Sequence, residues 1–167
     1  MSVMDWVKGM SRSGVVCVPY MRRISAVESK ADLFRVLCDA NGGAWLFNIH
    51  AKEPFRVPVD DFMEEFKTYI NGGRVMEYPK GYTSKLYCRY EGDIEILADT
   101  TLLYLLECRA SVIVPPNAYP TVVLSDRSRI SSVAMLPGSR LNIELYGDAE
   151  VIGISGDLGR VKTIRRQ

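Results

Sequence analysis

The stretch from Glu91 to Gln167 decides the fold, because its sequence divides into four segments of similar length. The segments are EGDIEILADTTLLYLLECR (91–109), ASVIVPPNAYPTVVLSDR (110–127), SRISSVAMLPGSRLNIELYGD (128–148) and AEVIGISGDLGRVKTIRRQ (149–167). Each opens with a polar or small pair and an apolar run, and a turn separates this run from a second one. Two strands in each repeat of 18 to 21 residues are typical of a β-solenoid, in which every coil stacks on the previous one.

The apolar runs give the positions of the expected strands. The first strand of each coil is expected at 94–97, 112–114, 130–133 and 151–154, and the second at 102–106, 122–124, 141–145 and 161–164. A ladder of hairpins also spaces its strands regularly, at roughly 8–12 residues, so an antiparallel β-sandwich or jelly roll is the alternative. The better match at the longer period favours a short β-solenoid or β-roll of about four coils.

The first eighty residues have a mixed pattern that predicts an α+β domain. Val3, Trp6, Val7 and Met10 follow the spacing of one helical face. Ser29 and Asp32 resemble a capping box that opens a second helix. The remaining expected elements are a strand at 14–19, a helix stop at 41–43, a strand at 44–49, a helix opened by Pro58 and ended at 71–73, and a strand at 74–78.

Length and composition agree with this organisation. The chain has 167 residues, of which 47% are hydrophobic and 25% are charged, as in ordinary globular proteins. Its apolar runs are shorter than the ~18 residues that a membrane-spanning helix needs. We expect an α+β domain at 1–80, a β-solenoid-like domain at 81–160 and a basic C-terminal tail at 161–167.

The N-terminus and the cysteines suggest a cytoplasmic protein. Residues 1–12 contain neither the apolar segment nor the cleavage site of a secretory signal. Cys17, Cys38, Cys88 and Cys108 are far apart and form no C-x-x-C pair, so free thiols are expected rather than a disulfide framework or a zinc site. The expected location is therefore the cytoplasm of a host cell, or a virion.

Residues able to perform catalysis are few. His50 is the single histidine, and no nucleophile and carboxylate are paired with it in the sequence. The glycines form no phosphate-binding loop. Acidic pairs occur at 60–61, 64–65 and at Asp93/Glu95, which leaves a hydrolase as a lesser alternative. We expect a protein that is not an enzyme and that needs no cofactor or metal.

A cluster of aromatic and basic residues lies where the two halves meet. Such a mixture can stack bases or sugars, although it also packs domain junctions. The candidate ligand-binding residues are Tyr82, Lys85, Tyr87, Arg89 and Tyr90. They give a second hypothesis, a binding module for carbohydrate or nucleic acid, and nucleic acid is not favoured because the net charge is only +1.

The two ends of the chain supply candidate interface residues. Stacked coils leave unpaired strand edges at an open end, which must be capped, covered or paired. The amphipathic N-terminal segment, with Trp6, could provide such a contact within the chain or between subunits. The last ten residues contain four basic and no acidic side chains, and Arg160, Arg165 and Arg166 are the interface candidates there.

The text LNIELYGDAEVIGISGD, at 141–157, together with an α+β head and a short β-coil tail, resembles uncharacterised proteins of bacteriophages and related mobile elements. The resemblance implies a phage-type origin and a structural or interaction role, and it supplies no catalytic residues. The leading hypothesis is therefore a non-enzymatic protein that acts through protein–protein contacts or self-assembly. Its expected partner is another protein or a second copy of itself, and no membrane is expected.

Overall fold

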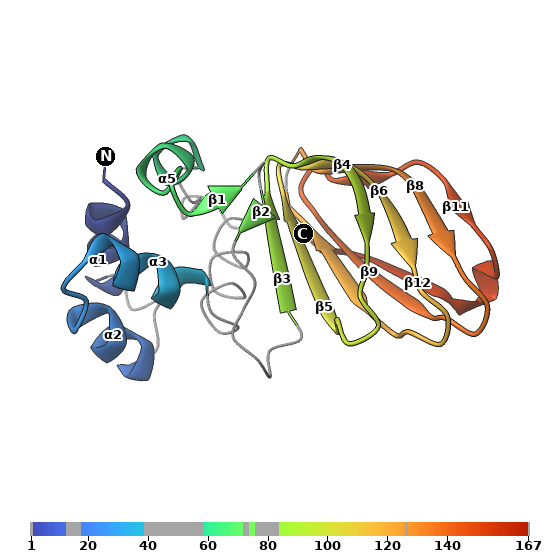
Figure 1. Cartoon of the computed structure of the whole chain (residues 1–167), viewed down its shortest axis with the longest axis horizontal. Coiled ribbons are helices and arrows are strands. Elements are labelled where there is room, and N and C mark those ends of the chain that lie inside the picture. Colours follow the sequence, from blue (N-terminus) through green and yellow to red (C-terminus); the bar gives the residue numbers. More distant parts are fainter. Residues whose placement is uncertain are drawn as a thin grey trace. The chain divides into compact units, whose positions relative to one another are not determined.

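The computed structural model describes residues 2–12, 18–38, 59–71, 74–75, 84–125 and 127–166. It divides the chain into two compact units, Met1–Asn71 and Gly72–Gln167 (Figure 1). The strand predicted at 44–49 and the helix stop at 41–43 lie outside the described residues, as do His50 and Tyr82.

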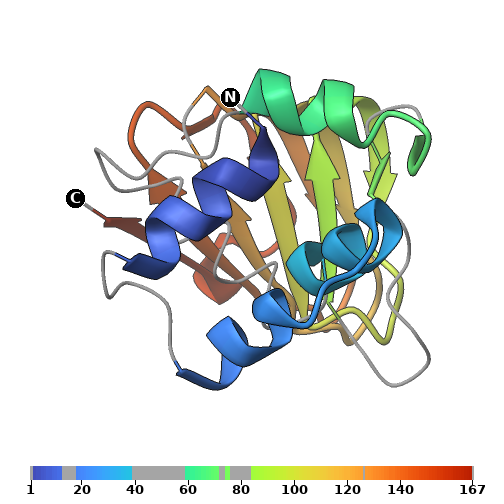
Figure 2. The same cartoon turned by 90° about the vertical axis from the view of Figure 1, so that its left-hand side faces the viewer.

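The described part of the first unit is mainly helical (Figure 2). Its elements are α1 (Val3–Arg12), α2 (Val18–Ser25), α3 (Lys30–Cys38), α5 (Val59–Glu65) and the short strand β1 (Ile70–Asn71). The predicted face of α1 is confirmed, because Val3, Trp6, Val7 and Met10 are all buried. The predicted cap of α3 is also present, since the Ser29 Oγ accepts a hydrogen bond from the Asp32 N–H at 3.1 Å.

Helix α2 corrects only the end of the strand predicted at 14–19, because residues 14–17 lie outside the described residues. A strand was expected at 14–19, yet Val18 and Pro19 form the first residues of α2. Proline is tolerated there, because the N–H that it lacks would have no partner in the first turn of a helix. The helix is fixed by Tyr20, which is buried and whose hydroxyl donates to the Val36 carbonyl of α3 at 2.5 Å.

An aromatic cluster forms a large part of the core of this unit. Phe34 of α3 lies 5.1 Å from both Phe66 and Tyr69, measured between ring centroids, and 6.3 Å from Phe62 of α5. At the start of α1, the Val3 N–H donates to the carboxylate of Glu65 at 2.9 Å. The aromatic contacts join α3 to α5, and the hydrogen bond joins α5 to α1.

The second unit is a two-sheeted parallel β-solenoid, as the repeat predicted. One sheet, sheet A, has the order β2 (Arg74–Val75), β3 (Ser84–Cys88), β5 (Leu102–Leu106), β7 (Thr121–Leu124), β9 (Leu141–Tyr146) and β12 (Val161–Arg166). The other, sheet B, has the order β4 (Glu91–Glu95), β6 (Arg109–Val114), β8 (Arg129–Met135), followed by β10 (Glu150–Val151) and β11 (Ile154–Ser155). Every strand pair in these two series is parallel except β2 with β3.

The register confirms the repeat length and excludes the antiparallel sandwich. Along sheet A, Ser84 pairs with Leu102, Leu102 with Thr121 and Thr121 with Asn142, in steps of 18, 19 and 21 residues. A last parallel pairing joins Asn142 to Lys162. Residues 161–166, which were assigned to a basic tail, therefore form the last strand of sheet A.

The corners between the sheets also repeat. Arg89, Glu107, Arg127 and Gly147 follow successive strands of sheet A, and all have positive φ values between 48° and 63°. The left-handed conformation turns the chain from sheet A to sheet B at the same place in each coil. Between the sheets, the inward side chains form one continuous apolar core that includes Leu105, Leu124 and Ile143.

Candidate functional site

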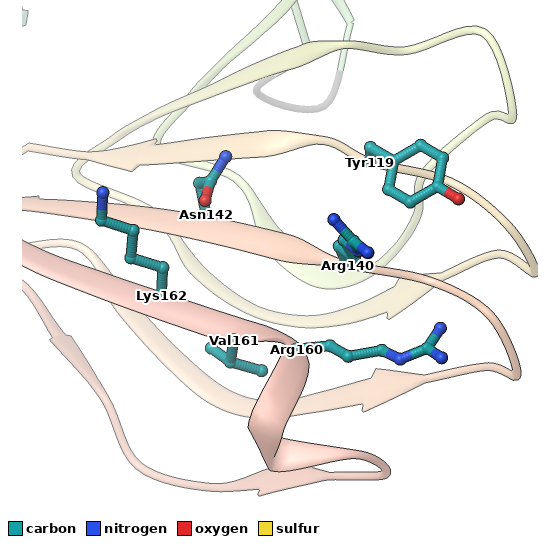
Figure 3. A pocket seen from close by; sticks show the side chains of 6 residues that line it. All are labelled: Tyr119, Arg140, Asn142, Arg160, Val161 and Lys162. Atoms are coloured by element: carbon teal, nitrogen blue, oxygen red, sulfur yellow. The ribbon is translucent and has the colours of Figure 1, made fainter.

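A basic groove lies on the last three coils, on the outer side of sheet A. It has a volume of about 510 Å³ and is lined by Tyr119, Arg140, Asn142, Arg160, Val161 and Lys162 (Figure 3). Tyr119 precedes β7, Arg140 directly precedes β9 and Asn142 lies in it. Arg160 is the last residue of the 3-10 helix η1 (Leu158–Arg160), and Val161 and Lys162 are the first residues of β12. Figure 3 shows these side chains on neighbouring strands near the same end of the sheet.

Parallel register places the cations of the groove beside one another. Arg140 and Arg160 directly precede Leu141 and Val161, which are register partners, and Lys162 is the register partner of Asn142. Adjacent strands lie about 4.8 Å apart, and residues two apart on one strand point to the same face. Three positive side chains are thus fixed on one small patch of the sheet.

The contacts within the groove leave most of this charge without a carboxylate. The Arg140 guanidinium lies over the Tyr119 ring, 5.8 Å from its centroid. Arg160 forms an ion pair with Asp157 at 3.1 Å. In the part of the chain that the structure describes, neither Arg140 nor Lys162 forms an ion pair. The side chains of Asn142 and Lys162 are exposed and can meet a ligand from solvent.

Like charges on neighbouring strands of a sheet repel one another. An anion bound between Arg140 and Lys162 relieves that repulsion and gains charge-assisted hydrogen bonds from both. Tyr119 is 63% exposed, so one part of its ring remains available for contact with a ligand. The groove therefore has the chemistry of a binding site for an anionic group, with an aromatic wall and an amide at its side.

The other two basic residues of β12 have structural partners. Arg166 pairs with Glu144 of β9 at 3.0 Å, and this hydrogen bond, together with the carboxylate charge, raises the pKa of the Arg166 guanidinium above its ordinary value. Arg165 donates to the carbonyl oxygens of Gly147 and Ala149. Among the predicted interface residues of this end, Arg160 lines the groove, whereas Arg165 and Arg166 hold β12 against the preceding coil.

The aromatic and basic residues predicted to bind a ligand do not all lie on the surface. Tyr87 is only 6% exposed and packs edge-on against Tyr90, with ring centroids 5.1 Å apart. Arg89 forms an ion pair with Glu107 at 2.8 Å, and Lys85 is half-buried on β3. Stacking needs an exposed ring face, so the burial of Tyr87 argues against a stacking site there. Both tyrosines instead pack with the core of the first coil.

The structure also places Trp6 and the acidic pair Asp93/Glu95. Trp6 is 6% exposed within α1. The carboxylate of Asp93 accepts a hydrogen bond from the Ser111 hydroxyl of the next coil, and Glu95 is exposed on β4. Among the residues that the structure describes, no group of three histidine, cysteine or acidic side chains could hold a metal ion.

Lys162, like Arg160, is one of the four basic residues expected at the end of the chain, but four other groove residues were not recognised from the sequence: Tyr119, Arg140, Asn142 and Val161. The repeat contained the necessary pattern. Arg140-Leu-Asn142 and Arg160-Val-Lys162 occupy equivalent positions of consecutive coils, twenty residues apart. Placing the repeat in register would have brought both triplets together on one face.

Comparisons with known proteins do not identify the chain: no family model, no curated protein and no solved structure matches it. The described helices contain none that is long and apolar enough to cross a membrane.

Proposed function

We propose that this protein is an interaction protein and that the basic groove binds an acidic segment of another protein. The observation that supports this proposal is the placement of Arg140 and Lys162 in one groove, two register positions apart on neighbouring segments of sheet A, without a carboxylate from the described residues. A surface patch of one charge sign attracts and steers a partner of the opposite sign.

An acidic protein suits this surface better than a nucleic acid does. Nucleic-acid binding relies on many phosphate contacts, and the groove offers three cations on a chain whose net charge is +1. Val161 adds an apolar surface that matches the side chains of a peptide. The proposal includes an origin in a phage or mobile element, which the sequence resemblance implies.

The test is equilibrium binding of a defined probe to the full chain. A short fluorescein-labelled peptide of alternating Glu and Val is titrated with the protein, and its fluorescence anisotropy is followed. The double variant Arg140→Glu/Lys162→Glu should bind about tenfold more weakly or worse, because two attractions become repulsions. A matched control, Arg35→Glu/Lys67→Glu, changes the net charge equally at exposed positions of the first unit.

Three results would contradict the proposal. The first is equal loss of binding in the groove variant and in the control, which would show that only the net charge of the protein affects binding. The second is equally strong binding of a peptide in which Lys replaces Glu. The third is stronger binding of a single-stranded oligonucleotide than of the acidic peptide, which would make nucleic acid the ligand.

A further inference from the structure

Strand β12 pairs along only one of its edges in the part of the chain that the structure describes. Among the described residues it pairs with β9 alone, in parallel register from Val161 to Arg166. On β9, the N–H of Asn142 donates to the preceding coil at Pro120, and the N–H of Arg140 does so at Ala118. N–H groups alternate in direction along a strand. By this alternation, Lys162 and Ile164 direct their N–H groups to β9, whereas Val161, Thr163 and Arg165 direct theirs to the open edge.

The last coil also leaves apolar side chains incompletely covered. Ile130, Val133 and Leu141 are each 1% exposed in the third coil. Their register partners in the fourth coil, Val151, Ile154 and Val161, are only partly buried against the core. Nearby, Ile152 is 56% exposed and Leu158 is 61% exposed. An additional strand on β12 would cover part of this apolar end and satisfy the open backbone groups.

We infer that the acidic partner binds by adding an extended segment to the open edge of β12 as the next strand of sheet A. This inference rests on the proposed function and deepens it. In such a strand, the side chains that lie outward next to Arg160 and Lys162 are acidic. The side chain between them points inward beside Val161 and is apolar. The recognised motif is therefore acidic–apolar–acidic in an extended conformation.

Charge selects this occupant over a second copy of the chain. Pairing β12 with β12 of another copy would bring Lys162, Arg165 and Arg166 of one strand against the same three residues of the other. Like charges directly opposite one another destabilise a pair of strands, and cationic side chains on edge strands are a common protection against self-association. A partner strand that carries carboxylates is instead attracted to the cations along this edge.

The experiment blocks the edge without removing a side-chain charge. Thr163→Pro removes one N–H that faces the open edge, while the N–H groups that bind β9 remain. Thr163→Val is the matched control, because it keeps the N–H and removes the hydroxyl. The probes are the labelled alternating Glu–Val peptide and a peptide with the same residues in two blocks. We expect Thr163→Pro to weaken the alternating peptide about tenfold, Thr163→Val to leave it unchanged, and the block peptide to bind more weakly.

A second measurement uses the unaltered protein and does not depend on the folding of a variant. Hydrogen exchange at the amides of Val161, Thr163 and Arg165 should slow when the alternating peptide binds. Strand addition is refuted if these amides exchange at the same rate with and without peptide, or if Thr163→Pro folds and binds normally. If strand addition is refuted but Arg140→Glu/Lys162→Glu still abolishes binding, the proposed function stands and only the mode of binding is wrong. A dimer of the free chain in light scattering, disrupted by Thr163→Pro, would assign the edge to a second copy and overturn the inference.

Discussion

Arg165 of β12 lies in register with Leu145 of β9. In the last coil a cation therefore occupies a position that an apolar core residue occupies in the coil before it. Its guanidinium donates to the Gly147 carbonyl at 2.7 Å and to the Ala149 carbonyl at 3.1 Å, which are corner groups of the preceding coil. Repeat proteins need terminal repeats with a polar outer face. Arg165 gives the last coil such a face at one corner and satisfies two backbone acceptors there.

Replacing this cap should lower stability and leave the fold unchanged. Arg165→Leu removes both hydrogen bonds and exposes an apolar side chain at the end of the core. The corner carbonyls can still meet water, so we expect a loss of about 1 kcal/mol in the free energy of unfolding. Urea unfolding followed by circular dichroism measures it. Lys162→Gln, which removes a neighbouring cation that holds no corner group, should change stability by less than ~0.5 kcal/mol. Equal effects of the two changes would show that Arg165 is not a cap.

Gly138 and Gly9 should respond to alanine in opposite directions. At Gly138, where φ is +79°, a Cβ would clash with the Asn117 Oδ1 of the neighbouring coil. Gly138→Ala should therefore cost about 1–3 kcal/mol through backbone strain and the clash. At Gly9, inside α1, nothing lies within 4 Å of an added Cβ. Gly9→Ala should stabilise its helix by up to about 1 kcal/mol. Thermal unfolding of both variants tests the pair, and a Gly138→Ala variant as stable as the parent chain would contradict the corner geometry.

Ser128 holds one corner of the coil stack together. Its side chain is 1% exposed, and its hydroxyl donates to the Leu105 carbonyl at 2.9 Å and accepts from the Cys108 N–H at 3.2 Å. Ser128→Ala leaves both buried backbone groups without this partner, and we expect a loss of about 1–3 kcal/mol. Ser131→Ala is the control, since that hydroxyl also donates to a backbone carbonyl, of Ala110 at 3.2 Å, but belongs to an exposed residue. If the control loses as much stability as Ser128→Ala, burial does not determine the cost.

The sequence was sufficient to predict the solenoid because its core positions repeat. Isoleucine, leucine and valine recur at the inward positions of each coil, and their spacing alone gave the strands that became β5, β7 and β9. The corner conformation was not predicted, because Arg89, Glu107 and Arg127 are not residue types that require a positive φ. Helix α2 was missed for a similar local reason, since Pro19 suggested the end of a strand.

The candidate site was predicted less well, because its residues lie on the outward face, where side chains need not repeat. Arg160 was identified from the charge of the last ten residues. Arg140 and Asn142 are ordinary polar residues in the sequence and become part of a groove only when register brings β9 beside β12. Within the predicted tyrosine site, the burial of Tyr87 was not foreseen, because the repeat frame began at Glu91 and did not include this inward residue.

The buried thiol of Cys108 should make the protein less stable at alkaline pH. Burial raises the pKa of this thiol from 9.0 to about 12, and hydrogen bonds from the backbone offset only part of that increase. The unfolded chain therefore loses this proton above about pH 9, whereas the folded chain keeps it up to about pH 12. Unfolding then releases a proton, so the stabilisation that is complete below pH 9 falls as pH rises, by at most about 1.4 kcal/mol per pH unit for this group.

The contribution of Cys108 is measured by comparing urea unfolding of the parent chain and of Cys108→Ala at several pH values above and below 9. The variant should have a shallower loss of stability with pH, because it has no thiol to ionise on unfolding. Other groups titrate equally in both proteins, so the difference between the two curves isolates the thiol. Parallel curves through this range would contradict the prediction. They would mean that Cys108 ionises equally in the folded and unfolded states, although its side chain is buried in the folded chain.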